Sequence, residues 1–174
     1  MFFRLLCAVL TTFAISTSFG FSASVDAREK KDNRRAVAVI IGNKNYQGKL
    51  PGVDFAHNDA RAFRHYVINV LKYDPENIID LRDATKSQIE STFGNERTHE
   101  GKLWRYIDPR GRSDIFVFYS GHGVPGLKDR KGYLLPVDAD PNAPEVNGYP
   151  LDTLYSNLAR LKAASVTVFL DACF

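Results

Sequence analysis

Two short stretches of the sequence place a reactive side chain directly after an apolar run. The first, residues 115–123, reads I-F-V-F-Y-S-G-H-G, and the second, residues 165–174, reads S-V-T-V-F-L-D-A-C-F. Apolar runs rich in β-branched residues are typical of strands in the middle of a parallel sheet. His122 and Cys173 therefore follow two such strands, and an open α/β sheet holds its site at the carboxyl ends of its strands.

A thiol and an imidazole at one sheet edge can perform nucleophilic catalysis if the two strands are parallel neighbours. A cysteine thiol is only slightly ionised near neutral pH, so a nearby imidazole that takes its proton supplies the nucleophile. Cys173 would then attack a carbonyl carbon, and His122 would act as base and afterwards as acid for the leaving amine. For residues 115–123 taken alone, the alternative is a strand followed by a tight turn that happens to carry a histidine.

Together the two stretches resemble the caspase-like cysteine peptidases, in which His-Gly follows one strand and Ala-Cys follows another about fifty residues later. Residues 119–123 (Y-S-G-H-G) and 171–173 (D-A-C) are more similar to metacaspases and bacterial caspase-like proteins than to animal caspases. The resemblance covers residues 35–174 and implies an α/β fold, a three-layer αβα sandwich with a mostly parallel central sheet. It also implies an oxyanion hole formed by the backbone N–H groups of Gly123 and Cys173.

Residues 1–27 have the pattern of a secretory signal peptide. Arg4 precedes the apolar residues 5–15, small residues follow, and residues 25–27 (V-D-A) offer a small residue at the cleavage position. The apolar part is short for a membrane span of about 20 residues. We therefore expect a secreted or periplasmic protein with no stable membrane association after signal cleavage. Anchoring by an uncleaved signal is the alternative.

Residues 28–34 form a basic linker, which we interpret as a solvated spacer. The net charge of +3 is modest and part of it lies in this linker, so no nucleic-acid partner is expected. Because Cys7 lies in the signal peptide, Cys173 is the one cysteine left after cleavage. A single thiol in an oxidising compartment indicates a functional role for that thiol rather than a structural disulfide. The expected partners are protein or peptide substrates, and no oligomeric state is assigned.

The remaining residues, 35–174, are enough for one domain. Apolar runs predict strands near residues 36–41, 77–81, 115–119 and from 165, and helical periodicity predicts helices from about 54, 86 and 151. Thr85 to Gln88 is a possible capping box. This alternation predicts right-handed crossovers and a mostly parallel sheet covered on both faces. Residues 124–131 and 140–150 are expected to be loops, and 132–138 a short extended segment near the site.

The resemblance also implies a substrate pocket opposite in charge to that of animal caspases. Animal caspases select an acidic residue and place a glutamine two residues before the cysteine, where this sequence has Asp171. Asp59 matches the position of a second metacaspase acid, and Ser120 matches a third pocket residue. Two carboxylates in one cleft can hold arginine bidentately, so we expect cleavage after Arg or Lys. The alternatives are that Asp59 favours a first helical turn and that Asp171 caps a strand.

Calcium is a further expectation from the resemblance, since metacaspases often need it. Asp138 and Asp152 match two of the aspartates that would hold the ion, and Ca²⁺ takes about six to eight oxygen ligands. Two acids do not make a site, so we expect at most weak Ca²⁺ binding and no cofactor that the sequence requires. Ordinary turn aspartates are the alternative.

Family members continue past the cysteine, so residues 35–174 correspond to the large-subunit part of the catalytic domain, with a sheet that is incomplete at the C-terminus. We expect the 174 residues alone to be inactive and poorly soluble. A terminal carboxylate next to Cys173 opposes thiolate formation, and an open sheet edge favours association. The expected function of the natural chain is a cysteine endopeptidase with a His/Cys dyad. A non-catalytic caspase-like interaction domain and an unrelated flavodoxin-like binding domain are the alternatives.

Overall fold

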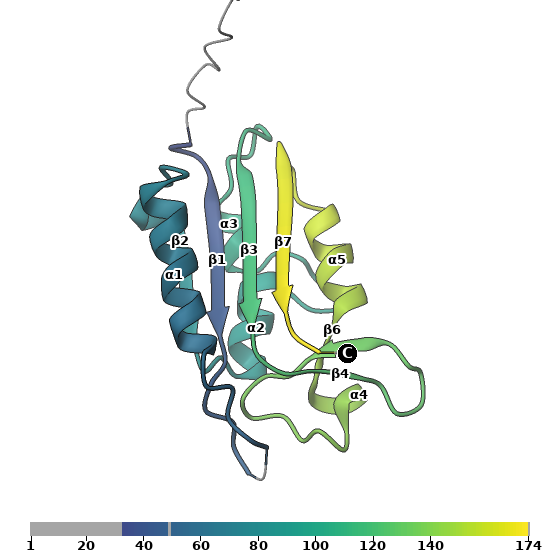
Figure 1. Cartoon of the computed structure of the whole chain (residues 1–174). Helices are drawn as coiled ribbons and strands as arrows, with labels where there is room; N and C mark the ends of the chain where they lie inside the picture. Colours follow the sequence, from purple (N-terminus) through teal and green to yellow (C-terminus); the bar gives the residue numbers. More distant parts are fainter. Residues whose placement is uncertain (1–32, 49, 174) are drawn as a thin grey trace, which may run out of the picture. The chain divides into compact units, whose positions relative to one another are not determined.

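Four parallel strands form the central sheet of the computed structural model, which describes residues 33–48 and 50–173 (Figure 1). In the sheet order β2-β1-β3-β7 they are β2 (Ile78–Arg82), β1 (Val37–Gly42), β3 (Asp114–Ser120) and β7 (Ser165–Asp171). The predicted signal peptide and residues 28–32 of the basic linker lie outside the described residues. Among the helices of the described part, none is long and apolar enough to cross a membrane.

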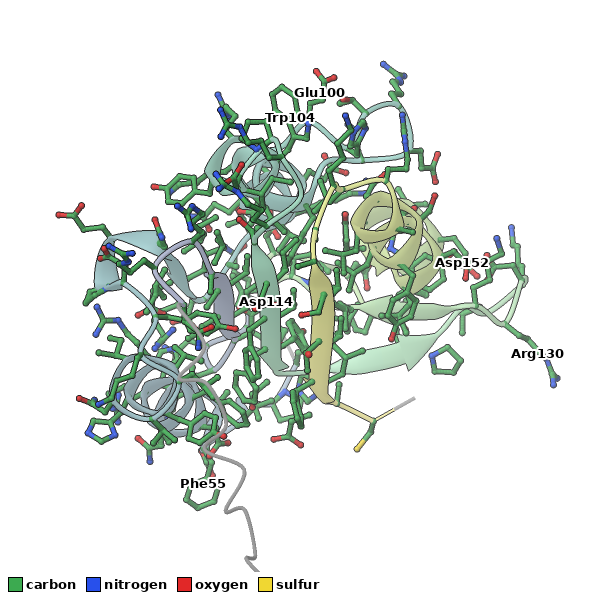
Figure 2. All side chains as sticks on the ribbon, turned by 90° about the horizontal axis from the view of Figure 1, so that it is seen from above. Phe55, Glu100, Trp104, Asp114, Arg130 and Asp152 are labelled. Carbon is green, nitrogen blue, oxygen red and sulfur yellow. The ribbon has the colours of Figure 1, made fainter. Side chains whose placement is uncertain are left out.

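Helices cover the sheet on both faces, as the sequence predicts. They are α1 (Ala56–Asn69), α2 (Lys86–Phe93), α3 (Lys102–Tyr106) and α5 (Leu151–Ala159), with a short 3-10 helix η1 (Pro75–Asn77) and a one-turn α4 (Pro144–Asn147). Figure 2 looks along the strands and shows Phe55, at the start of α1, on one side of the sheet and Trp104 of α3 on the other. The expected three-layer αβα arrangement around a parallel sheet is therefore confirmed.

Alternating side chains divide the core between the two faces, because successive residues of a strand point in opposite directions. Val39 and Ile41 of β1 pack in the cluster that includes residues of α2, α3 and α5. Ile40 of β1 packs in the cluster that includes residues of α1. In β3 the same alternation places Tyr119 in the first cluster and Phe118 in the second.

A small antiparallel sheet follows the turn that carries His122. It is formed by β4 (Gly123–Pro125), β5 (Gly132–Leu134) and β6 (Tyr149–Pro150), in the order β4-β5-β6. The sequence predicts loops at 124–131 and 140–150, and this prediction is wrong for β4, α4 and β6. Strands of two or three residues are too short to show a period of two, and proline is depleted in strands, so the pattern gave no strand signal here.

Local signals in the sequence set the start of α2 and permit the close packing of α1 on the sheet. Thr85 and Gln88 form both hydrogen bonds of the predicted capping box at the start of α2. Gly42, at the end of β1, allows α1 to approach the sheet closely, because a Cβ there would lie 2.6 Å from the Ala56 carbonyl oxygen and 2.9 Å from the Ala60 Cβ. The first turns of α1, which contain Asp59, therefore lie against the carboxyl end of β1.

β7 is more exposed than its apolar sequence indicates. All residues of β1 and β3 are buried, whereas Val166 and Phe169 of β7 are 40% and 48% exposed. Within the described part of the chain β7 pairs with β3 and lies at the edge of the sheet.

Candidate active site

The parallel register of β3 and β7 brings the two reactive side chains to the same edge. Ser120 of β3 pairs with Asp171 of β7, so His122 and Cys173 each lie two residues beyond a paired position. The Gly121 N–H donates to the Asp171 carbonyl at 3.2 Å and joins the two turns. The predicted parallel pairing of the two strands is confirmed, and Cys173 is exposed at the end of the described chain.

A backbone carbonyl orients the His122 ring. Nε2 of His122 lies 2.9 Å from the carbonyl oxygen of Pro51, in the loop after β1. A carbonyl oxygen only accepts hydrogen bonds, so Nε2 carries the proton and Nδ1 is the basic nitrogen of the neutral ring. The sequence predicts no third residue beside His122 and Cys173, because a backbone carbonyl can come from any residue type.

Two tyrosine hydroxyls hold the backbone of His122. The Tyr46 hydroxyl accepts the His122 N–H at 2.7 Å, and the Tyr119 hydroxyl donates to the His122 carbonyl at 2.8 Å. The Tyr46 ring also lies against the imidazole, with 4.6 Å between ring centroids. Burial raises the pKa of both hydroxyls, that of Tyr119 most, so both stay protonated at neutral pH. Neither tyrosine is among the site residues predicted from the sequence, although Tyr119 lies in a buried run, where a hydroxyl needs a partner.

Gly121 is required by this arrangement of hydroxyls. A Cβ at this position would lie 2.7 Å from the Tyr46 hydroxyl and 2.8 Å from the Tyr119 hydroxyl. The buried Asn43 side chain lies in the same region, accepting from the Ala84 N–H at 2.8 Å and donating to the Leu135 carbonyl at 3.2 Å. Small residues before His122 thus permit close packing of three polar side chains.

The ladder between β4 and β5 directs the Gly123 N–H away from β5. The Leu135 N–H donates to the His122 carbonyl at 3.0 Å, and Gly123 pairs with Leu134. A bond flanking the pair in this way makes Gly123 and Leu134 a non-hydrogen-bonded pair of the antiparallel ladder. The geometry is compatible with the predicted oxyanion-hole role of Gly123, which stays a prediction together with that of the Cys173 N–H.

Asp59 and Asp171 line one pocket of about 360 Å³. Asp59 comes from the first turn of α1 and Asp171 from the end of β7, and the buried Ser120 hydroxyl lies 3.4 Å from Oδ2 of Asp171. Aromatic rings form the apolar part of the pocket, where Phe63 stacks on Phe118 at 3.8 Å between centroids. An apolar floor with carboxylates beside it suits a long side chain that ends in a cation.

The two calcium candidates, Asp138 and Asp152, each have a different polar partner. Oδ1 of Asp138 accepts the Lys86 N–H at 2.9 Å, at the first residue of α2. Oδ2 of Asp152, labelled on α5 in Figure 2, lies 3.1 Å from Nζ of Lys131. Among residues 33–48 and 50–173, no group of three or more His, Cys, Asp or Glu residues could hold a metal ion. The expectation of at most weak Ca²⁺ binding stays a prediction.

We predict that titration with Ca²⁺ produces at most a weak calorimetric signal, unchanged by Asp138→Ala. The same substitution should lower the free energy of unfolding by about 1 kcal/mol, because it removes a charge-assisted bond at the start of α2. Asp140→Ala, in the neighbouring turn, is the matched control for the calorimetry. Tight Ca²⁺ binding that disappears in Asp138→Ala would contradict this.

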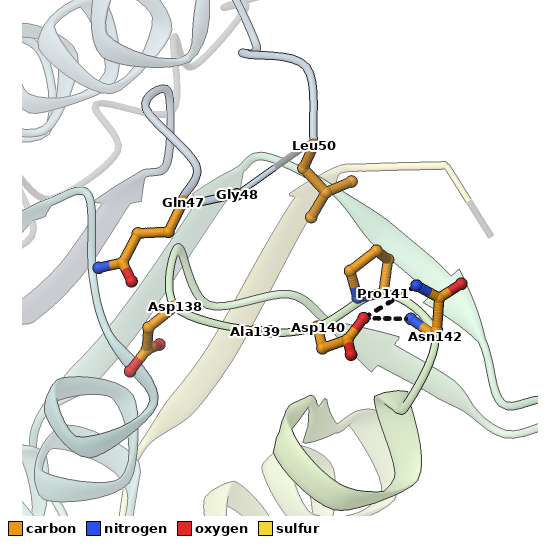
Figure 3. A pocket seen from close by; sticks show the side chains of 8 residues that line it. All are labelled: Gln47, Gly48, Leu50, Asp138, Ala139, Asp140, Pro141 and Asn142. Carbon is orange, nitrogen blue, oxygen red and sulfur yellow. Dashed lines mark hydrogen bonds between the residues drawn. The ribbon is translucent and has the colours of Figure 1, made fainter.

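A second pocket, of about 390 Å³, lies between the loop before Pro51 and the loop after β5 (Figure 3). Gln47 and Leu50 line one side, and residues 138–142 line the other. The Gln47 N–H donates to the Val137 carbonyl at 2.8 Å and holds the two loops together. The loop whose Pro51 carbonyl orients His122 is therefore supported from the β5 side.

Asp83 fixes the loop on the other side of Tyr46. Its Oδ1 accepts the N–H groups of Lys44 and Asn45 at 2.8 and 2.9 Å and lies 2.9 Å from Nε2 of His57. Partial burial alone would raise the pKa of Asp83, but the bonds from Asn45, Lys44 and His57 outweigh burial and lower it to about 2. The ionised carboxylate thus stabilises this loop.

We predict that Asp83→Asn lowers the free energy of unfolding at pH 6 by about 1–2 kcal/mol, allowing for solvent screening. A carboxyl whose pKa is lowered by folding stabilises the protein above its unfolded pKa and loses this contribution as pH falls through the folded value. The difference between the two proteins should therefore shrink from about pH 4 towards pH 2. Denaturant unfolding at several pH values measures it, with the exposed Asp54→Asn as control. A difference independent of pH would contradict the assignment.

Comparison with known proteins shows a family and similarity to two relatives. The caspase domain model matches residues 35–174. The chain is similar to Metacaspase-1 of Candida glabrata, with 26% identity over 147 residues, which cover 80% of this chain and 36% of the relative. It is also similar to Metacaspase-1B of Neurospora crassa, with 28% identity over 107 residues, which cover 60% of this chain and 25% of the relative. The chain thus spans about a third or less of the length of these relatives.

Proposed function

The chain belongs to the caspase-domain family, and on that premise we propose that it is a cysteine endopeptidase with Cys173 as nucleophile and His122 as general base. The observation that carries this proposal is the register of β3 and β7. Ser120 and Asp171 are paired, so the imidazole and the thiol follow neighbouring parallel strands at the same offset. Nucleophile and base on adjacent strand ends are the arrangement that a dyad requires.

The proposed reaction begins with transfer of the Cys173 proton to Nδ1 of His122. The thiolate attacks the substrate carbonyl carbon, and the negative charge that develops on its oxygen is stabilised by the N–H groups of Gly123 and Cys173. The imidazolium then gives its proton to the leaving amine, and an acyl-enzyme remains. Water activated by the neutral imidazole hydrolyses the thioester and restores the thiol. Throughout, the Pro51 carbonyl accepts from Nε2 and holds the ring in one tautomer.

We further propose that the enzyme cleaves after Arg or Lys. Asp59, Asp171 and the Ser120 hydroxyl support this assignment, since both carboxylates line the pocket on the α1 face of the sheet. An arginine side chain would lay its methylene groups on Phe63 and Phe118 and direct its guanidinium to the acids. An aspartate in the same pocket would be repelled by both carboxylates.

The test uses the protein at its full natural length and three peptides that differ only in Arg, Lys or Asp before the scissile bond. We expect hydrolysis after Arg and Lys and none after Asp, and a peptidyl electrophile ending in arginine should label Cys173, as located by mass spectrometry. Failure of both hydrolysis and labelling in a folded protein would overturn the peptidase assignment. Labelling with a preference for Asp would overturn the specificity alone.

Export is part of the proposal, because residues 1–27 have the pattern of a signal peptide. A protein secreted or released to a periplasm should lack these residues, with its new N-terminus near residue 28. N-terminal sequencing of the protein recovered from each cell fraction tests this. A full-length protein that stays in the membrane fraction would favour the uncleaved anchor instead.

A further inference from the structure

Both backbone polar groups of His122 are bonded to tyrosine hydroxyls from different parts of the chain. Tyr119 belongs to β3, three residues before His122, and is fully buried. Tyr46 comes from the loop after β1, and its hydroxyl and ring contact the N–H and the imidazole of the same residue. Tyr46 is therefore in contact with the base through both its polar and its aromatic part.

We propose that Tyr46 is a positioning residue for catalysis, whose hydroxyl fixes the backbone of the His122–Gly123 turn and whose ring supports the imidazole of His122. This inference rests on the proposed function, because it concerns the base of the proposed dyad. Tyr46 does not touch the reacting atoms, and its effect passes through His122.

The bonds around Tyr46 show why the loop after β1 can act as a fixed support. The Tyr46 hydroxyl lies 3.3 Å from the Leu135 carbonyl and 3.4 Å from the Tyr119 hydroxyl, so it can donate in one direction while it accepts the His122 N–H from another. The preceding residues are held by Asp83, and the following residue, Gln47, is held by Val137. Tyr46 is thus anchored on both sides in sequence.

The orientation of the turn matters for two parts of the proposed reaction. The imidazole is directed by the His122 backbone, and the next peptide group carries the Gly123 N–H, which the β4–β5 register turns away from β5. Rotation of the His122 peptide would displace both groups. Because misplacement of a reacting group by about 1 Å can cost about 100-fold in rate, a support for this turn affects turnover more than substrate binding.

The test compares Tyr46→Phe with Tyr155→Phe, an exposed tyrosine of α5, in the full natural chain. Phenylalanine keeps the ring and removes the acceptor for the His122 N–H. For an arginine peptide we expect kcat of Tyr46→Phe to fall about 10- to 100-fold with KM nearly unchanged, and Tyr155→Phe to match the natural protein.

Alkylation of Cys173 by iodoacetamide supplies a readout that needs no turnover. Mass spectrometry follows the rate of alkylation on the peptide that contains Cys173, between pH 5 and 9. Because only this peptide is quantified, alkylation of Cys7 does not contribute. If the natural protein and His122→Ala show the same profile, the proposed dyad fails. If the two profiles differ, Tyr46→Phe should shift the profile towards that of His122→Ala. A Tyr46→Phe variant with the same kcat and the same alkylation profile as Tyr155→Phe would overturn the role of Tyr46.

A folding defect is separated from a positioning defect by circular dichroism of each variant. Should Tyr46→Phe not fold, 3-fluorotyrosine at position 46 takes its place, since fluorine weakens the hydroxyl as an acceptor and keeps the size of the ring nearly unchanged. We then expect a graded fall in kcat and an intermediate alkylation profile. Kinetics and alkylation equal to those of the natural protein would equally overturn the proposal.

Discussion

Cys173→Ala is expected to lower kcat/KM for an arginine peptide by about 10⁴-fold or more, because it removes the atom that forms the covalent intermediate. His122→Ala should cost a similar factor, since the thiol then lacks the group that accepts its proton. The double variant should be no slower than either single variant, because nucleophile and base act as one unit. Steady-state kinetics on the full natural chain measure all three.

The matched control for the base is His65→Ala, which removes an exposed imidazole of α1. We expect no change in kcat/KM for this variant. Losses that multiply in the Cys173→Ala, His122→Ala double variant would show that the two residues act in separate steps. Activity retained in His122→Ala would exclude it as the base.

Neutralising the pocket acids is expected to remove most of the preference for arginine. Asp59→Asn with Asp171→Asn should lower kcat/KM for an arginine peptide by about 100-fold, because the substrate guanidinium loses both of its charged partners. A peptide with citrulline, which has nearly the shape of arginine without its charge, should change much less. The ratio of the two specificity constants therefore reports the charge interaction separately from shape.

Asp54→Asn is the control for this experiment, since Asp54 is an exposed acid near the start of α1. It should leave the ratio of arginine to citrulline unchanged. Raised salt should weaken the arginine preference of the natural protein only partly. Asp59 is partly buried, and salt screens an ion pair between a partly buried carboxylate and a guanidinium less than it screens an exposed ion pair. An unchanged ratio in the double variant would exclude the pocket as the source of specificity.

The parallel sheet and the site at its edge are predictable from sequence because they depend on local patterns. The apolar runs of β1 and β3 are unbroken, and the residues after β3 and β7 change abruptly to glycine, histidine and cysteine. Asp59 and Asp171 were paired through the family resemblance, and the fold places both in one pocket. Their location in the same pocket depends on how α1 packs against the sheet, and no local sequence pattern predicts that packing.

The parts that sequence reasoning missed depend on contacts between distant segments. The Pro51 carbonyl and the Tyr46 hydroxyl reach His122 from a loop about 70 residues earlier, and a loop sequence gives no direction to its polar groups. The calcium role of Asp138 stays a prediction, and its contact with the start of α2 is another feature that depends on a distant segment. In the sequence, a carboxylate that accepts the first N–H of α2 cannot be distinguished from any other acidic residue near a site.

The alternation of β3 across the sheet separates the two sets of residues that flank His122. Tyr119 packs on the face covered by α2, α3 and α5, whereas Phe118 belongs to the α1 face and lines the pocket with Asp59. Substitutions at sites more than about 7–10 Å apart that share no partners usually add within about 0.3–0.5 kcal/mol. We therefore expect changes at Asp59 and at Tyr46 to combine independently. A substitution in the proposed specificity pocket would then leave the alignment of the proposed base unchanged.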